Sequence, residues 1–480
     1  MRSIKENFLY SFILTGANYI FPLIVYPYIM RVLGVGGIGL CDFVDSIINY
    51  FILFSMMGMS IVGIREIAAC KEDSAKLTRT FNSLLTVNAI ATLVALIALV
   101  VATFAVAKLR EHTDMMAFGM VKLVANLFLF EWFYKGVEDF RFVTIRSIVV
   151  RTLFVIAVFA FVHTPEDVGL YYFLTVMIVV VNALVNVKYL RRFVRVSFSF
   201  RDAKLFLSPF LLTGCYMLLT SMYTTFNTAY LGFVSSDVEV GYYSVSARLF
   251  TVLLSVYTAF TGVMLPRMSS LLAQGENVRF KELIGKSVDI LMCFAIPIVI
   301  FSELLTPEII RLISGPGYEG AILPMRIIMP LVFVIGYEQI LVNQALMPLK
   351  KDRVIMVNSI VGAVLGVSLN LALVGCIYAT GSAIVWCSSE VAILILSQIF
   401  VTRFVGVKFP IADFLKNILC YLPAIALLYM LSVSGLEFYW KVATGVFGMI
   451  VYFVLVQHFV IKNRFVLEAV EGASSKFRKR

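Results

Sequence analysis

The feature that most constrains this chain is a recurrence of apolar stretches, each long enough to cross a lipid bilayer, along its 480 residues. A transmembrane helix needs roughly 20 apolar residues, and the stretch ATLVALIALVVATFAVA at 91–107 contains no charged residue. Hydrophobic residues make up 61% of the chain and charged residues 14%, against about 45–50% and about 25% in soluble domains. This composition excludes a water-soluble fold.

The predicted fold is an all-α polytopic membrane protein with about fourteen transmembrane helices. Helices are expected because backbone N–H and C=O groups in lipid must form their hydrogen bonds within the span. The apolar runs also lack the alternation of apolar and polar residues that transmembrane β-strands show. The expected spans are 7–33, 38–63, 82–107, 115–135, 142–163, 168–188, 206–232, 240–266, 284–304, 321–347, 354–375, 378–402, 412–434 and 438–461.

The distribution of basic residues predicts the orientation in the membrane. The formal net charge is +11, but most Lys and Arg residues lie in alternate joints and in the tails, for example in 188–204, 348–353 and KFRKR at the C-terminus. Cytoplasmic joints attract Lys and Arg. We therefore expect both termini in the cytoplasm, and we do not expect nucleic acid as a partner.

An internal repeat predicts two lobes. Segments 8–34 and 206–232 share Phe, Leu, Thr and Gly identities at an offset of 198 residues, and Gly39 and Arg65 match Gly241 and Arg267 at an offset of 202. Each copy has six spans, and because this number is even, both copies start on the same side of the membrane and have the same orientation. Transporters built from parallel repeats have this arrangement. The expected organisation is an N-lobe with a basic cytoplasmic linker (1–198), a C-lobe (199–404), two extra spans (405–461) and a basic cytoplasmic tail (462–480).

Polar residues form a stripe along the first two spans of each copy. The most regular stripe is in the eighth expected span, where the spacing places all members on one helix face: Ser244, Arg248, Thr251, Ser255, Thr258 and Gly262. Related positions in the other three spans are Thr15, Asn18, Pro22, Tyr26, Asp42, Asp45, Asn49, Thr213, Thr220, Thr224 and Asn227. Hydroxyl groups also hydrogen-bond between packed helices, so the charged residues are more informative.

Charged residues at membrane depth cost about 2.5 kcal/mol or more, and they normally face a cavity or a partner. The cations predicted to bind substrate are Arg31, Lys122, Arg151, Arg248 and Arg326, with Arg248 the strongest candidate. Their number favours an anionic cargo, because a buried cation requires a counter-charge. The candidates for ion coupling are Asp42, Asp45, Glu338 and Glu390. Structural alternatives are that Glu131 neutralises Arg151 and that Arg31 reaches the outer surface.

Other motifs do not indicate catalysis or a cofactor. The sequence GVGGIG at 34–39 follows a membrane span and lacks the βαβ context of a dinucleotide site, so we interpret it as a tight turn. The seven cysteines and three histidines are scattered, which favours neither a disulfide framework nor a metal site. We expect a protein that is not an enzyme and that binds no cofactor, with proton or sodium coupling as an open alternative.

Five stretches resemble the polysaccharide or O-antigen flippases of the multidrug/oligosaccharidyl-lipid/polysaccharide exporter superfamily. They are YPYIMRVLGVGGIGLCDFVDSIINYF (26–51), GIREIA (63–68), EWFYKGVEDFRFVTIRSIVVR (131–151), VGYYSVSARL (240–249) and VMLPRMSSLL (263–272). The resemblance implies movement of a lipid-diphosphate-linked oligosaccharide from the inner to the outer leaflet of a bacterial inner membrane. It also implies a basic lumen, membrane lipids as surroundings and other polysaccharide-assembly proteins as partners. Asp42 and Asp45 depart from the family pattern, in which neutral residues are expected.

Two other functions remain open. The same fold would serve an ion-coupled antiporter for cationic drugs, which would need a predominantly acidic binding wall. A membrane-bound glycan polymerase or ligase would need acid and base residues on the outer face, where the joints are short and 303–320 is the longest.

Overall fold

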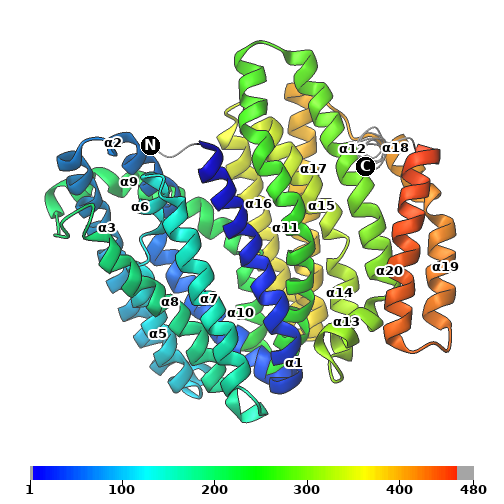
Figure 1. Cartoon of the computed structure of the whole chain (residues 1–480), viewed down its shortest axis with the longest axis horizontal. Coiled ribbons are helices and arrows are strands. Elements are labelled where there is room, and N and C mark those ends of the chain that lie inside the picture. Colours follow the sequence, from blue (N-terminus) through cyan, green and yellow to red (C-terminus); the bar gives the residue numbers. More distant parts are fainter. Residues whose placement is uncertain (1–3, 462–480) are drawn as a thin grey trace, which may run out of the picture. The chain divides into compact units, whose positions relative to one another are not determined.

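The computed structural model describes residues 4–461 of the chain, and these residues form helices without strands (Figure 1). The prediction of an all-α membrane protein is confirmed for this part of the chain. The predicted basic tail, 462–480, lies outside the described residues.

The chain divides into two compact units, Met1–Gly241 and Tyr242–Arg480. The lobe boundaries expected from the repeat stay a prediction. The described helices of the first unit are α1 (Ile4–Met56), α2 (Met59–Cys70), α3 (Ser74–Ala105), α4 (Ala107–Arg110), α5 (Thr113–Leu127), α6 (Glu131–Gly136), α7 (Phe140–Phe161), the 3-10 turn η1 (Pro165–Asp167), α8 (Val168–Leu190), α9 (Phe200–Ser221) and α10 (Thr225–Val234).

The helix α11 (Asp237–Ala273) begins in the first unit and continues into the second. The other described helices of the second unit are α12 (Asn277–Leu304), α13 (Thr306–Ser314), η2 (Glu319–Ala321), α14 (Ile322–Ile328), α15 (Leu331–Gln339), η3 (Ile340–Leu346), α16 (Asp352–Leu369), η4 (Asn370–Val374), α17 (Gly375–Val405), α18 (Ile411–Cys420), α19 (Leu422–Val433), α20 (Phe438–Leu455) and η5 (Val456–Ile461). The segments η3, η4 and η5 are π-helical.

Ten helical stretches in the described part of the chain are long and apolar enough to cross a membrane, or eleven if the bent pair α18 and α19 counts as one span. Two of these stretches have 62 and 54 residues, far more than the roughly 20 that one crossing needs. The first contains a break at Gly34 and the second a break at Ile377 and Tyr378. Gly34 and Ile377 lie between expected spans and Tyr378 is the first residue of one, but the number fourteen stays a prediction.

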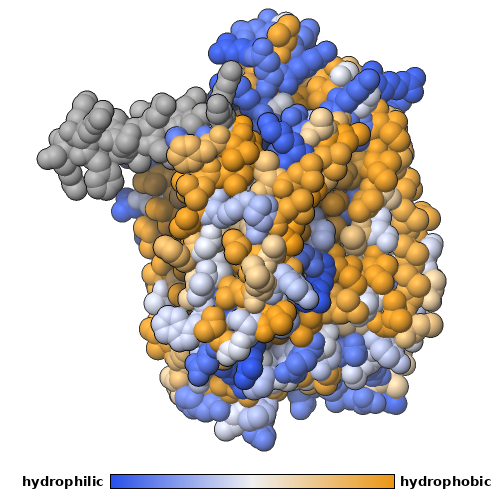
Figure 2. Space-filling view, turned by 90° about the vertical axis from the view of Figure 1, so that its right-hand side faces the viewer, coloured by the Kyte–Doolittle hydropathy of each residue, from blue (hydrophilic) through white to orange (hydrophobic). Residues whose placement is uncertain are grey.

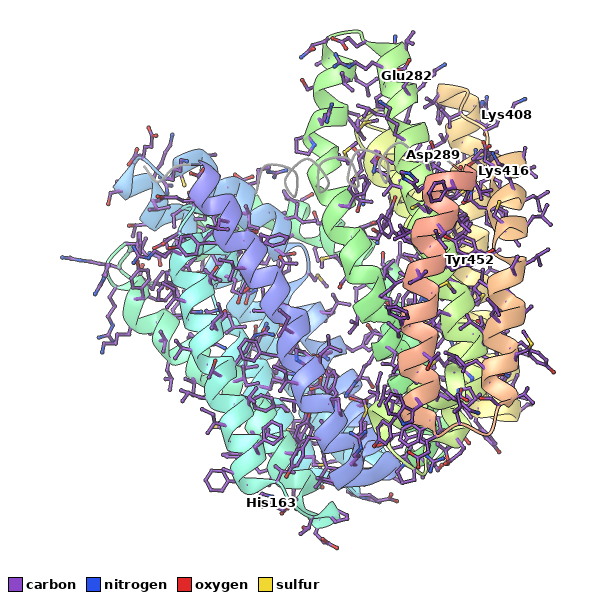
Figure 3. All side chains as sticks on the ribbon, turned by 45° about the vertical axis from the view of Figure 1, so that its right-hand side comes forward. His163, Glu282, Asp289, Lys408, Lys416 and Tyr452 are labelled. Atoms are coloured by element: carbon purple, nitrogen blue, oxygen red, sulfur yellow. The ribbon has the colours of Figure 1, made fainter. Side chains whose placement is uncertain are left out.

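The surface is also that of a membrane protein. Figure 2 shows the face on the side of α19 and α20, where hydrophobic side chains fill a broad middle region and hydrophilic side chains gather at both ends. In the second unit, Glu282, Asp289, Lys408 and Lys416 all lie toward one of these ends (Figure 3). Such a distribution matches an apolar bilayer interior between two aqueous phases.

An aromatic core fixes the break between α5 and α6 in the first unit. Phe130 adopts a left-handed conformation with φ 49°, which turns the chain before α6. The Phe81 ring packs against the rings of Phe130, Trp132 and Phe133, at centroid distances of 5.3, 5.6 and 5.2 Å. A Cβ on Gly63 would lie 2.8 Å from the Trp132 ring, so only glycine fits beside it. The aromatic block thereby holds Glu131 at a defined place.

The glycine-rich segment 34–39 contacts the start of α11. Only Gly34 leaves the helical conformation, with φ 69°, so the predicted turn is a break at one residue. A Cβ on Gly39 would lie 1.7 Å from the carbonyl oxygen of Asp237, and one on Gly241 would lie 2.3 Å from that of Val35. Two glycines that match in the repeat therefore permit a close backbone approach.

Candidate functional site

An ion pair joins α5 and α1 within the first unit. Nζ of Lys122 lies 2.5 Å from Oδ1 of Asp45, and the side chains are 15% and 31% exposed. The sequence placed these two residues in different roles, Lys122 in substrate binding and Asp45 in ion coupling. The structure brings their charges together, which offsets the cost of placing each one among apolar helices.

Two neutral side chains complete this cluster. The amide of Asn49 donates to Oδ2 of Asp45 at 2.9 Å, and the hydroxyl of Tyr172 on α8 lies 3.4 Å from Oδ1. Lys122 also lies 3.5 Å from Oδ1 of Asn49. The four residues Asp45, Asn49, Lys122 and Tyr172 are called the α1–α5 cluster below. Because its ammonium and hydroxyl groups donate and its carboxylate accepts, it can bind polar groups of either kind.

A second cluster joins α6, α7 and α8. Nη2 of Arg146 donates to Oε1 of Glu131 at 2.9 Å, and Nη1 donates to Oδ1 of Asn186 at 2.6 Å. Lys135 adds a longer ion pair to Glu131 at 3.5 Å. Glu131 is therefore neutralised mainly by Arg146, and Arg151, its partner in the sequence-based alternative, interacts with it electrostatically. The Arg146 side chain is only 3% exposed, which gives this cluster a structural role.

The other four predicted cations are not members of these two clusters. Arg31 is exposed on α1, and its Nη1 donates to the carbonyl of Pro27 at 2.6 Å. Arg151 is half-buried on α7, and Arg248 is half-buried on α11. Arg326 is exposed on α14. The structure therefore leaves the substrate-binding role of these residues as a proposal.

The second unit contains an acidic pair within its helices. Glu390 on α17 is buried, and its Oε1 accepts a hydrogen bond of 3.1 Å from Nε1 of Trp386. Glu338 on α15 lies close enough to Glu390 for their carboxylates to interact electrostatically. Two carboxylates that share an apolar interior favour binding of a proton or a cation. Asp42, the fourth candidate for ion coupling, is half-buried on α1 in the first unit.

Polar side chains of the predicted stripes have two kinds of partner. Gln339 on α15 joins two positions of α11, since its Oε1 accepts from Thr261 and its Nε2 donates to Thr258, both at 3.2 Å. Other hydroxyls donate to the carbonyl four residues earlier in the chain, at distances of 2.9–3.1 Å: Thr15, Thr213, Thr220 and Thr224. Such bonds satisfy the hydroxyl without any ligand.

Sequence reasoning missed Arg146, Asn186 and Tyr172 as members of the two clusters. Arg146 lies in the stretch EWFYKGVEDFRFVTIRSIVVR, fifteen residues after Glu131, so the charge itself was a usable signal. The two α8 residues carry no sequence pattern that separates them from packed helix residues. In the described residues, no group of three or more His, Cys, Asp or Glu side chains could hold a metal ion.

Comparisons with known proteins agree with this architecture. A family model described as "Polysaccharide biosynthesis protein" matches residues 4–272. An Escherichia coli (strain K12) protein named "Putative O-antigen transporter" is 26% identical over 345 residues, covering 70% of this chain and 82% of that protein. A protein of the same name from Shigella dysenteriae is 23% identical over 368 residues, covering 75% and 90%.

Two solved structures share the fold. A lipid II flippase, MurJ, in an inward closed conformation has a TM-score of 0.76 at 13% identity, covering 95% of this chain and all of that chain. An inward-facing multidrug resistance transporter of the MATE family, in the MOP superfamily, has a TM-score of 0.62 at 13% identity, covering 80% and 94%. At these identities the likeness concerns the fold alone.

Proposed function

Because the chain belongs to the polysaccharide biosynthesis protein family, we propose that it is a flippase for a lipid-diphosphate-linked oligosaccharide. The observation that carries the proposal is the family match over residues 4–272, which include four of the five candidate substrate-binding cations. The named relatives are transporters, so the proposal contains no catalytic step. The protein is a multi-pass membrane protein, and we place it in the bacterial inner membrane with both termini in the cytoplasm.

The cargo moves from the cytoplasmic to the periplasmic leaflet by alternating access. Each of Arg31, Arg151, Arg248 and Arg326 is proposed to contact the diphosphate on the path of the cargo, because guanidinium groups bind phosphate oxygens through paired hydrogen bonds. Lys122 joins this path when the cargo competes with Asp45 for its ammonium group. Other polysaccharide-assembly proteins supply and receive the cargo.

Alternating access requires a contact that forms in one state and breaks in another. The approach of Gly39 to Asp237 and of Gly241 to Val35 is such a contact in the proposal. It joins corresponding positions of the two repeats. Separation of these two backbones would open one end of the path.

A reconstituted transport assay with two arginine variants tests the proposal. Arg248→Ala removes the strongest candidate for cargo binding, and Arg279→Ala removes an exposed arginine that pairs with Glu276 at 3.1 Å near the start of α12. We expect Arg248→Ala to lower the rate of lipid-diphosphate oligosaccharide movement at least about tenfold, the effect of losing a charged hydrogen bond, and Arg279→Ala to leave it unchanged. Equal rates for Arg248→Ala and wild type would contradict a path through Arg248.

The acidic pair in α15 and α17 supports a second candidate, an ion-coupled multidrug antiporter. A cationic drug would bind to the half-buried Glu338 and the buried Glu390. Efflux of a cationic dye that requires Glu390, without movement of the lipid-linked oligosaccharide, would support this alternative against the flippase.

A further inference from the structure

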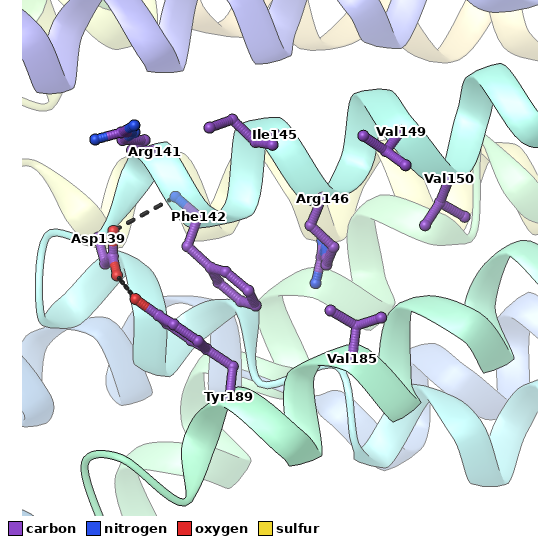
Figure 4. A pocket seen from close by; sticks show the side chains of 9 residues that line it. All are labelled: Asp139, Arg141, Phe142, Ile145, Arg146, Val149, Val150, Val185 and Tyr189. Carbon is purple, nitrogen blue, oxygen red and sulfur yellow. Dashed lines mark hydrogen bonds between the residues drawn. The ribbon is translucent and has the colours of Figure 1, made fainter.

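A groove of about 380 Å³ lies between the start of α7 and the end of α8 in the first unit (Figure 4). It is called the α7–α8 groove below. Its lining includes Arg141, Ile145, Arg146, Val149, Val185 and Tyr189. The groove is separate from the α1–α5 cluster, and the proposed transport mechanism does not use it.

One part of the α7–α8 groove is apolar and faces outward. Ile145, Val149 and Val185 are 47%, 52% and 38% exposed. On α7 this face continues through Leu153 and Ile156, which are 57% and 59% exposed. Residues spaced by three or four positions lie on one helix face. In a membrane protein, such a face contacts acyl chains, so a chain can lie along the groove.

The other part of the groove is lined by Arg141, and a second exposed arginine, Arg192, contacts the lining residue Tyr189. Arg141 is exposed at the start of α7, and the exposed Arg192 lies over the Tyr189 ring, with 5.1 Å between its Cζ and the ring centroid. Asp139 is the opposing charge here, and it accepts a hydrogen bond of 2.7 Å from the Tyr189 hydroxyl. This bond to Asp139 joins the beginning of α7 to the end of α8, where the basic joint 188–204 starts.

Arg146 adds a buried, positively charged side chain to the groove lining. Its two terminal nitrogens donate to Glu131, Asn186 and Ser147. Its Nε is buried without a hydrogen-bond partner among the residues that the structure describes. The side chain lines the groove and points between α7 and α8 (Figure 4). Glu131 compensates most of this charge, so what Arg146 offers an anion in the groove is the N–H donor at its Nε.

We infer that the α7–α8 groove binds an anionic glycerophospholipid from the leaflet on the side of the basic joint. Its acyl chain lies along Ile145, Val149 and Val185, and its phosphate lies near Arg141 and Arg192. Basic pockets between transmembrane helices are known to bind lipid phosphates on the cytoplasmic side. A carried glycan fits the groove poorly, because its exposed wall beyond Arg141 is apolar.

Lipid retention in mixed bilayers tests this inference. The full chain is placed in nanodiscs with equal amounts of phosphatidylglycerol and phosphatidylethanolamine, and the lipids that stay bound after release are measured by native mass spectrometry. We expect phosphatidylglycerol to be retained in excess. Arg141→Gln should lower this excess about fivefold, the effect of about one surface charge near a lipid phosphate.

Two tryptophan variants separate the groove from the rest of the lipid-facing surface. Ile145→Trp fills the groove and should abolish the excess, whereas Ile97→Trp makes the same change at an exposed position of α3, outside the groove lining, and should preserve it. The thermal unfolding temperature of each variant checks that it folds.

Several results would overturn the inference. They are equal retention of the two lipids by wild type, the same excess in Arg141→Gln or Ile145→Trp, or loss of the excess in Ile97→Trp. Displacement of the lipid by inorganic phosphate would indicate a simple anion site, and displacement by a polyprenyl diphosphate would indicate a cargo site. Retention is measured without transport, so failure of the flippase proposal would leave this result unaffected.

Discussion

Lys122 and Asp45, separated by 77 positions in the sequence, form an ion pair of 2.5 Å between α5 and α1. The sequence offered both residues as functional candidates, but it gave no reason to pair them. The pair places a cation that could hold the cargo next to a carboxylate that competes for it. The strength of this pair therefore bears on both stability and transport.

The first prediction concerns the energy of this pair. Lys122→Met leaves Asp45 without its counter-charge, so we expect a loss of about 2 kcal/mol in unfolding free energy, less than for a fully buried pair because Asp45 is partly exposed. Asp45→Asn should destabilise similarly, and the double variant should recover much of the loss. Unfolding in mixed micelles measures this double-mutant cycle. Additive losses in the double variant would show that the two charges are not coupled.

The second prediction compares the two arginines near Glu131. Arg146→Gln removes the hydrogen bonds to Glu131 and Asn186, and we expect it to destabilise the protein by about 3 kcal/mol, as when one partner of a buried pair is lost. Arg151→Gln is the matched control on the same helix, and it should cost about 1 kcal/mol or less. A larger loss for Arg151→Gln would mean that Arg151, and not Arg146, is the partner of Glu131.

Sequence reasoning succeeded where a local pattern decides the structure. Continuous apolar runs predicted the helices, because lipid leaves backbone groups no other partner, whereas GVGGIG predicted a tight turn where the structure has a break at one residue, Gly34. The partner of Glu131 is a tertiary choice between Arg146 and Arg151, and sequence spacing did not decide it. The spacing of Thr213 and Thr220 suggested that their hydroxyls face a lumen, but both hydroxyls donate to carbonyls of their own helix. A helical-wheel pattern cannot distinguish a hydroxyl that faces a lumen from one that is bonded within its helix.

The third prediction concerns the close approach at Gly39. Gly39→Ala puts a methyl group where the Asp237 carbonyl lies, so the two backbones must separate, with an expected cost of about 1–3 kcal/mol. Gly169→Ala is the control, because no atom lies within 4 Å of its Cβ position. Cross-linking of cysteines introduced at Val35 and Val240 should fall in Gly39→Ala and stay at the wild-type level in Gly169→Ala. Unchanged cross-linking in both variants would argue against a contact that separates during transport.

The fourth prediction concerns the acidic pair of the second unit. If Glu338 and Glu390 couple transport to an ion, Glu390→Gln should abolish the acceleration that an imposed proton or sodium gradient gives to cargo movement, while movement without a gradient persists. Glu282→Gln, a change at an exposed position toward one end of the unit (Figure 3), should retain the acceleration. Full acceleration in Glu390→Gln would remove Glu390 from ion coupling.

The most direct measurement is the fraction of a fluorescent lipid-diphosphate oligosaccharide that reaches the far leaflet of proteoliposomes containing the wild-type protein, compared with protein-free liposomes. The account predicts rapid movement that depends on the protein, competition by an unlabelled lipid-diphosphate oligosaccharide, and no competition by a cationic drug. Equal movement in protein-free liposomes, or efflux of the drug without movement of the lipid-linked oligosaccharide, would contradict it.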